Sequence, residues 1–381
     1  MHKAECAAFR KAAPRRPPTA IRVLCRILWR KASDPPSYQA VEKLQSHRME
    51  QTAERLETFA QMTILIRSLV GEDVCLDAEA MVKLLCQFSC NSISISDEEL
   101  VNIGVGMFPT LALVNHSCSP NTAIIFNGSK ATLRSIKPIA AGEEVLQSYT
   151  EIAEPRHIRQ RELQQTYFFT CVCPVCSLGQ RPDPRTTYIC PRGPQACAGI
   201  VDLREHDVGG AVCSVHGALT ADEQAWLENP LTEAHAKYDQ AVQTREAAKD
   251  GQRALELGLL ARALLAPITR GGNAARLRID RLVLAMYLQK GDSAGAYPIA
   301  CEMKEAFDEL YEGEHPAKAV QAYLVFKLAE WAEPENRALL VQLGEAAVAA
   351  MGRSHGENCA MWKEAMEKLQ PLRSGVPGAF A

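Results

Sequence analysis

Three closely spaced cysteines could bind a metal ion. Cys171, Cys173 and Cys176 follow one another in the pattern Cys-x-Cys-x2-Cys. A structural zinc ion takes four ligands in a tetrahedron, and cysteine thiolates are among the groups that it prefers. The alternative is three buried cysteines, but such short spacings in a loop leave little core in which to bury them. The pattern therefore predicts a zinc site that needs one more ligand from elsewhere in the chain.

A second group has looser spacing. Cys190, Cys197, Cys213 and His216 form the pattern Cys-x6-Cys-x15-Cys-x2-His. Two interpretations remain open at this point. The four residues bind another zinc ion, or they are unpaired and partly buried residues with no metal.

Two polar motifs precede the cysteines. Asn115-His116-Ser117-Cys118-Ser119-Pro120-Asn121 is followed by Gly142-Glu143-Glu144 and then by Tyr149. Alone, the first motif would be interpreted as a turn with a buried histidine and cysteine. Its combination with the second motif and with Cys-x-Cys-x2-Cys makes a plain turn a poor explanation.

In combination, these motifs resemble the SET–MYND (SMYD) family of protein-lysine methyltransferases. SET domains carry the pair NHSCxPN and GEExxxxY, which cross in that fold to form a knot-like active site. The segments 104–109 (GVGMFP) and 167–176 (YFFTCVCPVC) resemble the SET–MYND proteins in particular. The resemblance extends from residue 1 to about residue 370.

The resemblance implies a role for each matching residue. Tyr149 is expected at the methyl-transfer site, and Tyr167 is expected to line the lysine channel. The residues expected to bind S-adenosylmethionine are Asn91, Asn115, His116, Tyr149 and Phe169. The expected zinc ligands are Cys118, Cys171, Cys173 and Cys176. For Phe168 and Phe169, core packing is the alternative interpretation.

The implied chemistry sets two physical requirements. Methyl transfer needs a neutral lysine amine, whereas free lysine has a pKa of about 10.4. A narrow apolar channel disfavours the ammonium ion and so lowers that pKa. The enzyme must also align the methyl donor and the amine, and such positioning can supply several kcal/mol of the barrier.

Net charge, apolar run length and cysteine count limit the kinds of partner and the cellular location that we expect. The 381 residues carry a net charge of only −3, so no strong overall field favours a polyanionic partner. No apolar run approaches the roughly 20 residues that span a bilayer. Fourteen cysteines in a reducing compartment favour metal binding or burial over disulfides. We expect the protein in the cytoplasm, the nucleus or both.

The elements that position these residues change character along the chain. Helical periodicity is expected over residues 19–31, 50–70 and 78–88, with Asp77 as a helix N-cap and a loop over 32–48. Short strands are expected over 92–95, 123–126, 131–136 and 145–149, with a hairpin turn at Asn127-Gly128.

Residues 171–216 are expected to be loop-rich. Roughly six helices should follow, and His315 and His355 mark a repeat of 40 residues that is typical of paired-helix arrays.

The expected fold class is α+β: a SET-type β-fold with a helical insert and a zinc-binding post-SET region, followed by an all-α tetratricopeptide-like domain. The expected domains are a remnant of the MYND zinc finger with a basic helix (1–31), the helical insert (32–90), the C-terminal half of the SET core (91–152), the post-SET region (153–220) and the helical domain (221–381).

The resemblance also reveals departures. His2 and Cys6 match the last two ligands of a MYND finger, but the other six ligands and the N-terminal SET strands have no counterpart, which predicts an N-terminally truncated form and a flexible first segment. Ser46-His47 stands where the family has an asparagine. Residues 1–31 carry nine basic side chains and one acidic one, which suits a structured segment better than a transit peptide.

Two functions follow as hypotheses. The first is a methyltransferase that uses S-adenosylmethionine and zinc, with a lysine of a histone tail or another protein as substrate and with protein partners for its C-terminal helices. The second is a catalytically impaired SET-fold scaffold that binds proteins. Neither a membrane nor nucleic acid is expected as a direct ligand, because the basic segment lacks the interleaved aromatic residues that stack on bases.

Overall fold

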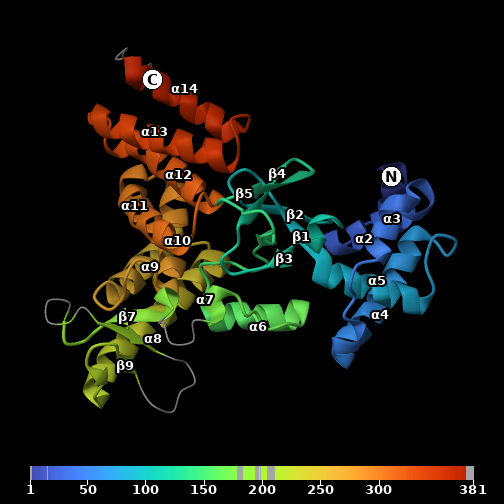
Figure 1. Cartoon of the computed structure of the whole chain (residues 1–381), viewed down its shortest axis with the longest axis horizontal. Helices are drawn as coiled ribbons and strands as arrows, with labels where there is room; N and C mark the ends of the chain where they lie inside the picture. Colours follow the sequence, from blue (N-terminus) through green and yellow to red (C-terminus); the bar gives the residue numbers. More distant parts are fainter. Residues whose placement is uncertain are drawn as a thin grey trace. The chain divides into compact units, whose positions relative to one another are not determined.

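The computed structural model describes residues 2–14, 16–177, 183–193, 197, 199–203 and 211–374. The chain divides into two compact units. The first consists of Met1–Arg134, Ile139–Tyr149 and Gln160–Cys171, and the second of Ser135–Pro138, Thr150–Arg159 and Val172–Ala381. Figure 1 shows both, coloured along the chain. Among the described residues, no helix combines the length and the apolar character needed to cross a membrane.

A group of helices opens the first unit. They are α1 (His2–Ala12), α2 (Thr19–Ser33), α3 (Pro35–Glu42), α4 (Ala53–Val70) and α5 (Ala78–Asn91), with a short 3-10 helix at Arg48–Glu50. Their shared core buries apolar side chains of α2, α4 and α5, among them Leu24, Leu28, Ile66, Met81 and Leu85. Asp77 caps α5, because its carboxylate accepts a hydrogen bond from the backbone N–H of Ala80. The predicted helices 19–31, 50–70 and 78–88 are confirmed.

Two expectations for this region were wrong. Residues 35–42 form α3 rather than a loop. Proline at the first positions of a helix costs no hydrogen bond, and the Asp34 side chain caps α3 by accepting from the N–H of Ser37. The first segment is the helix α1 rather than a flexible terminus. Glu5 of α1 pairs with Arg22 at 3.2 Å and with Arg26 at 2.7 Å, so the basic segment is structured as expected.

Short strands complete the first unit. They are β1 (Ser92–Ser96), β2 (Asn102–Met107), β3 (Asn115–His116), β4 (Thr122–Asn127), β5 (Lys130–Ser135) and β6 (Leu146–Gln147). Among the described residues they pair as β1–β2, β3–β6 and β4–β5. The β4–β5 pair confirms the hairpin, and Gly128 in its turn has a φ of 58°, which glycine adopts without the steric cost that other residues incur.

The segment that follows is more regular than expected. It contains α6 (Arg156–Tyr167) and α7 (Pro174–Ser177), and a short 3-10 helix at Pro184–Thr186. A small sheet follows, with strands β7 (Thr187–Ile189), β8 (Ile200–Asp202), β9 (Val212–Cys213) and β10 (Gly217–Ala218). Its strand order is β10-β9-β8-β7. The loop-rich interpretation of 171–216 therefore missed a sheet, whose strands of two or three residues are too short to show an alternating pattern.

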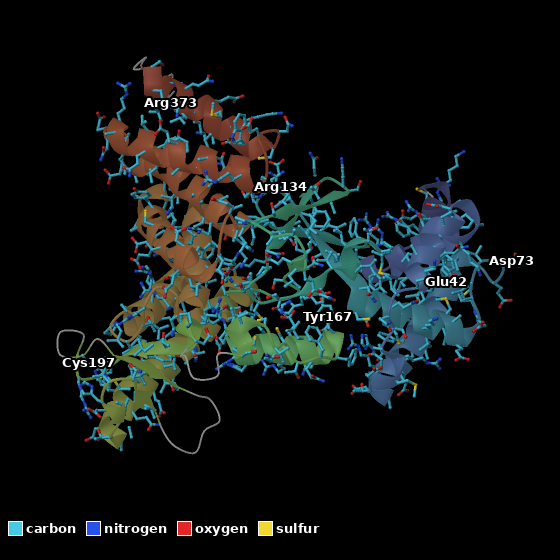
Figure 2. All side chains as sticks on the ribbon, in the orientation of Figure 1. Glu42, Asp73, Arg134, Tyr167, Cys197 and Arg373 are labelled. Carbon is cyan, nitrogen blue, oxygen red and sulfur yellow. The ribbon has the colours of Figure 1, made fainter. Side chains whose placement is uncertain are left out.

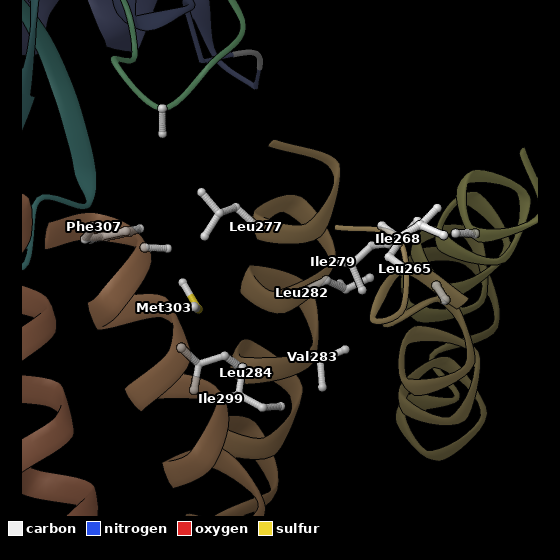
Figure 3. Close-up of a cluster of buried hydrophobic side chains, with 14 of the residues drawn as sticks. Leu265, Ile268, Leu277, Ile279, Leu282, Val283, Leu284, Ile299, Met303 and Phe307 are labelled. Atoms are coloured by element: carbon white, nitrogen blue, oxygen red, sulfur yellow. The ribbon is translucent and has the colours of Figure 1, made fainter. Parts of the chain in front are cut away.

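Helices make up most of the second unit from residue 221 to residue 374. They are α8 (Ala221–Gln243), α9 (Gly251–Leu265), α10 (Ala274–Lys290), α11 (Ser293–Leu310), α12 (Pro316–Ala332), α13 (Arg337–Ser354) and α14 (Ala360–Ser374), with a π-helix at Thr244–Ala248. Over residues 221–374, these seven α-helices are one more than expected. Figure 3 shows part of the core, where Leu265 of α9, Leu282 of α10 and Met303 of α11 are buried in one apolar cluster.

Helix pairs are present in this region, but the predicted period of 40 residues is wrong. The pair α11–α12 begins at residue 293 and the pair α13–α14 at residue 337, so the spacing is 44 residues rather than 40. Both histidines lie in the turn inside a pair. His315 caps the start of α12, whereas His355 follows the end of α13, so their positions within the two turns are not equivalent.

Candidate active site and zinc centre

The two polar motifs are fastened together by backbone pairing. Strands β3 and β6 run parallel, with Asn115 opposite Leu146 and His116 opposite Gln147. The side-chain amide of Gln147 extends this pairing by donating to the carbonyls of Leu111 at 3.0 Å and Val114 at 3.1 Å. The start of the first motif is therefore held in a fixed register against the residues between Glu144 and Tyr149.

The buried side chain of Asn121 also holds the two motifs together, at the place where they cross. Its amide nitrogen donates to Oε1 of Glu143 at 3.0 Å and to the carbonyl of Glu144 at 2.8 Å. Its carbonyl oxygen accepts from the N–H of Leu146 at 2.8 Å. On the exposed side, Asn115 donates to Oε1 of Glu144 at 2.6 Å. The sequence contained both motifs, but sequence reasoning assigned no role to Asn121 or to the two glutamates.

His116 has one defined tautomer. Its Nδ1 accepts from the backbone N–H of Tyr149 at 2.9 Å, and a backbone N–H can only donate. The ring proton of the neutral imidazole is therefore on Nε2, which lies 3.3 Å from Sγ of Cys118. His116 thus donates to that sulfur and holds the backbone of Tyr149 at the same time.

Aromatic rings gather around Tyr149. Its ring centroid lies 4.7 Å from that of Tyr167 and 6.5 Å from that of Phe169, and His116 lies 6.0 Å from Phe169. Tyr167 ends α6 (Figure 2). The Tyr149 hydroxyl donates to the carbonyl of Val114 at 2.7 Å. The structure therefore brings together the predicted residues His116, Tyr149, Tyr167 and Phe169.

Both phenols in this cluster stay protonated at neutral pH. Burial raises the pKa of Tyr149 above its usual value. Burial, together with the neighbouring Glu162 carboxylate, raises the pKa of Tyr167 to about 12. The rings thus form an uncharged surface with hydroxyl groups at its edge, which disfavours a charged amine beside it.

Asn91 lies at the end of α5, next to the loop in which Ser46-His47 stands where the family has an asparagine. Its amide donates to the carbonyls of Gln87 and Gln45, both at 2.8 Å. Two residues after Gln45, the His47 ring stacks on Phe168 with centroids 5.3 Å apart. His47 and Phe168 both have positive φ, 47° and 61°, a conformation that is uncommon for residues other than glycine. No local sequence signal could have paired residues so far apart in the chain.

The predicted zinc ligands converge. The four sulfur atoms lie within 4.8 Å of one another in the cluster Cys118, Cys171, Cys173 and Cys176. Gln160 of α6 fixes Cys171 from both sides, because its amide donates to the Cys171 carbonyl at 2.7 Å and accepts from the Cys171 N–H at 2.9 Å. Four thiolates in this arrangement suit a structural zinc ion, and Cys118 is the ligand that also contacts His116.

The SET domain family model matches residues 23–150, a range that contains both polar motifs and ends just after Tyr149. The chain contains a SET domain. Histone-lysine N-methyltransferase ASHR1 of Arabidopsis thaliana is 28% identical over 344 residues, which cover 89% of this chain and 70% of that protein. N-lysine methyltransferase SMYD2 of Gallus gallus is 34% identical over 188 residues, and histone-lysine N-methyltransferase SMYD3 of Mus musculus is 31% identical over 189 residues.

These matches are consistent with the SET–MYND resemblance of the motifs. The SMYD2 alignment covers 48% of this chain and 43% of SMYD2, and the SMYD3 alignment covers 46% and 43%. The chain thus matches less than half the length of these two vertebrate relatives. All three relatives are named as lysine methyltransferases.

Proposed function

We propose that this chain is an S-adenosylmethionine-dependent protein-lysine N-methyltransferase that acts on histones or other proteins. One observation carries the proposal. The pairing of β3 with β6 holds Tyr149 beside His116, Tyr167 and Phe169, the residues that the family resemblance assigns to methyl transfer, cofactor binding and the lysine channel. The cytoplasm or the nucleus is the proposed location, since fourteen cysteines without a disulfide among them suit a reducing compartment.

The residues assigned to the cofactor match its chemical groups. S-adenosylmethionine combines an aromatic base, a polar ribose and a charged amino-acid end, and it supplies a methyl group bonded to a sulfonium when bound. The half-buried rings of Phe168 and Phe169 offer apolar faces for the base. Asn91, Asn115 and His116 offer hydrogen-bonding groups that are not fully buried. We assign cofactor binding to Asn91, Asn115, His116, Tyr149 and Phe169.

The chain's own residues would prepare the lysine. The protonated rings of Tyr149 and Tyr167 exclude water and place no charge beside the amine, so they favour its neutral, nucleophilic form. The Tyr149 hydroxyl is held by the Val114 carbonyl, and its remaining lone pairs can accept a hydrogen bond from the amine. Alignment of this kind, rather than proton transfer, is the main contribution expected of the site.

Calorimetry with S-adenosylmethionine tests the cofactor part of the proposal. We expect saturable binding at one site per chain, weakened about fivefold or more in Phe169→Ala, because an aromatic stacking partner is worth about 1–3 kcal/mol. Phe9→Ala, in α1, is the matched control and should bind like the wild type. Absence of binding by the folded chain, or equal binding by Phe169→Ala, would contradict the assignment.

A further inference from the structure

A second set of metal ligands converges in the small sheet of the second unit. Cys190 follows β7, Cys197 precedes β8, Cys213 ends β9 and His216 lies in the turn before β10. Their ligand atoms all lie within 4.8 Å of one another. The sequence alone had left this group open between a zinc site and plain burial. Cys197 is labelled in Figure 2.

The distances in this cluster match a tetrahedron. Cys197 Sγ lies 3.7 Å from Cys213 Sγ. Nδ1 of His216 lies 3.6 Å from Cys190 Sγ and 3.7 Å from Cys213 Sγ. Zinc bonds of about 2.3 Å to sulfur and about 2.0 Å to nitrogen give tetrahedral edges of about 3.8 Å between sulfurs and about 3.5 Å between sulfur and nitrogen. A zinc ion at the centre would therefore reach all four ligands at ordinary bond lengths.

Gly199 shows that the close approach of the sulfurs is built into the backbone. A Cβ atom at this position would lie 2.7 Å from Cys213 Sγ and 2.9 Å from Cys197 Sγ, which is closer than atoms can pack. The Gly199 N–H also donates to Cys197 Sγ at 3.2 Å. A donor aimed at the sulfur favours the thiolate, which is the form that binds metal.

A disulfide and plain burial, the two alternatives to a metal site, explain fewer features of this cluster. A disulfide needs sulfurs about 2.05 Å apart, whereas Cys197 and Cys213 are separated by 3.7 Å. Plain burial accounts for the three cysteines, all of which are buried, but not for His216. That residue is exposed and still directs Nδ1 at two sulfurs. Convergence of an imidazole nitrogen and three thiols is the ligand set of a Cys₃His zinc site.

The surroundings indicate what such an ion would do. The strands of this sheet are two or three residues long, and strands that short have little stability of their own. The sheet is nevertheless attached to the helices of the same unit. The N–H of Ile189 donates to the Ile268 carbonyl at 2.9 Å, and the Asn273 amide donates to the Thr187 carbonyl at 3.0 Å. Holding the sheet together thus also holds its attachment to the α9–α10 turn.

We propose that Cys190, Cys197, Cys213 and His216 bind a second zinc ion, separate from that of the Cys118 cluster, which fixes the β7–β10 sheet onto the helices of the second unit. All four coordination positions are filled by protein side chains. The ion therefore has no open position for water or substrate and is structural rather than catalytic.

The zinc content of the full chain tests the proposal. Native mass spectrometry should find two zinc ions per chain. Cys213→Ser should retain one, Cys171→Ser in the other cluster should also retain one, and the double variant should retain none. Cys301→Ser, which removes a half-buried cysteine of α11 outside both clusters, should keep two. One zinc ion in the wild type, or two in Cys213→Ser, would overturn the proposal.

X-ray absorption at the zinc edge gives a readout that does not depend on a destabilised variant. Two sites, Cys₄ and Cys₃His, should give an average of about 3.5 sulfur and about 0.5 nitrogen ligands per zinc in the wild type. His216→Cys should keep two zinc ions and raise the average to about four sulfur ligands. A wild-type signal from sulfur alone, or an unchanged ratio in His216→Cys, would contradict the assigned ligand set.

Discussion

Nε2 of His116 lies 3.3 Å from Sγ of Cys118, and the opposite nitrogen of the same ring accepts from the backbone N–H of Tyr149. One imidazole therefore joins the predicted zinc cluster to the predicted catalytic tyrosine. Groups that donate hydrogen bonds to metal ligands orient those ligands and influence metal affinity. The zinc ion and the methyl-transfer site should consequently respond together when this ring is removed.

His116→Ala tests that coupling. We expect zinc at the Cys118 cluster to be bound roughly 10–100-fold more weakly, as is typical when a hydrogen-bond donor to a metal ligand is lost. Methyl transfer should fall with it, because the backbone of Tyr149 loses its anchor. Chelator competition and a labelled-methyl assay measure the two effects. His157→Ala, on the exposed face of α6, is the control, and equal zinc affinity in both variants would contradict the coupling.

Tyr149→Phe removes only the hydroxyl that contacts Val114. We expect kcat to fall by about two orders of magnitude, since a positioned hydroxyl acts on the reacting atoms, whereas cofactor affinity should change less than about threefold, because most of the ligand is held by other groups. Calorimetry and turnover separate the two effects. Tyr238→Phe, in α8, is the matched control, and an unaffected kcat in Tyr149→Phe would remove its catalytic role.

Asn121→Ala should destabilise the first unit. Asn121 is buried and makes three hydrogen bonds across the motif crossing, each worth about 1 kcal/mol net. We expect the free energy of unfolding in urea to fall by about 3 kcal/mol. Asn115→Ala removes a single exposed hydrogen bond to Glu144 and should cost less than about 1 kcal/mol. Similar losses in the two variants would show that Asn121 does not lock the crossing.

A pH-dependent stability is expected from His315. Burial lowers the pKa of His315 to about 4, although the nearby Glu151 carboxylate raises it and Lys318 lowers it further. The unfolded chain takes up this proton near its usual pKa of about 6.5. Between these values the unfolded state binds more protons, so the stability contributed by the neutral ring is complete above pH 6.5 and decreases as the pH falls toward 4.

Urea unfolding at pH 7 and pH 5 measures this contribution, which should amount to about 2 kcal/mol over that interval. His315→Asn keeps a side-chain acceptor for the N–H of Ala317, which His315 now caps, because asparagine is a good N-cap. The difference between the two pH values should shrink in the variant. An unchanged difference would show that other groups produce it.

The sequence was sufficient where a local pattern dictates the element. The Asn127-Gly128 turn between two β-branched runs predicted the β4–β5 hairpin, and Asp77 predicted the start of α5, because turn and capping geometry depend on neighbouring residues alone. The Cys118 cluster was predicted through the motif resemblance. The four sulfurs do converge.

The sequence was insufficient where a contact is set by the packing of distant segments. The stacking of His47 on Phe168 and the convergence of Cys213 and His216 on Cys190 depend on tertiary structure, and loose spacing alone could not decide the latter. Helix α3 was missed for a different reason. Two prolines at its start were interpreted as a loop signal, although proline is well suited to the first turn of a helix.

Transfer of a labelled methyl group from S-adenosylmethionine tests the central claim most directly. The full chain should label histones or other lysate proteins, and mass spectrometry should place the label on the ε-amine of lysine. The Tyr149→Phe variant, folded and zinc-loaded, should transfer at most a few per cent as much label. Label on a residue other than lysine, or equal labelling by the wild type and Tyr149→Phe, would contradict the account, as would no labelling by a chain that binds the cofactor.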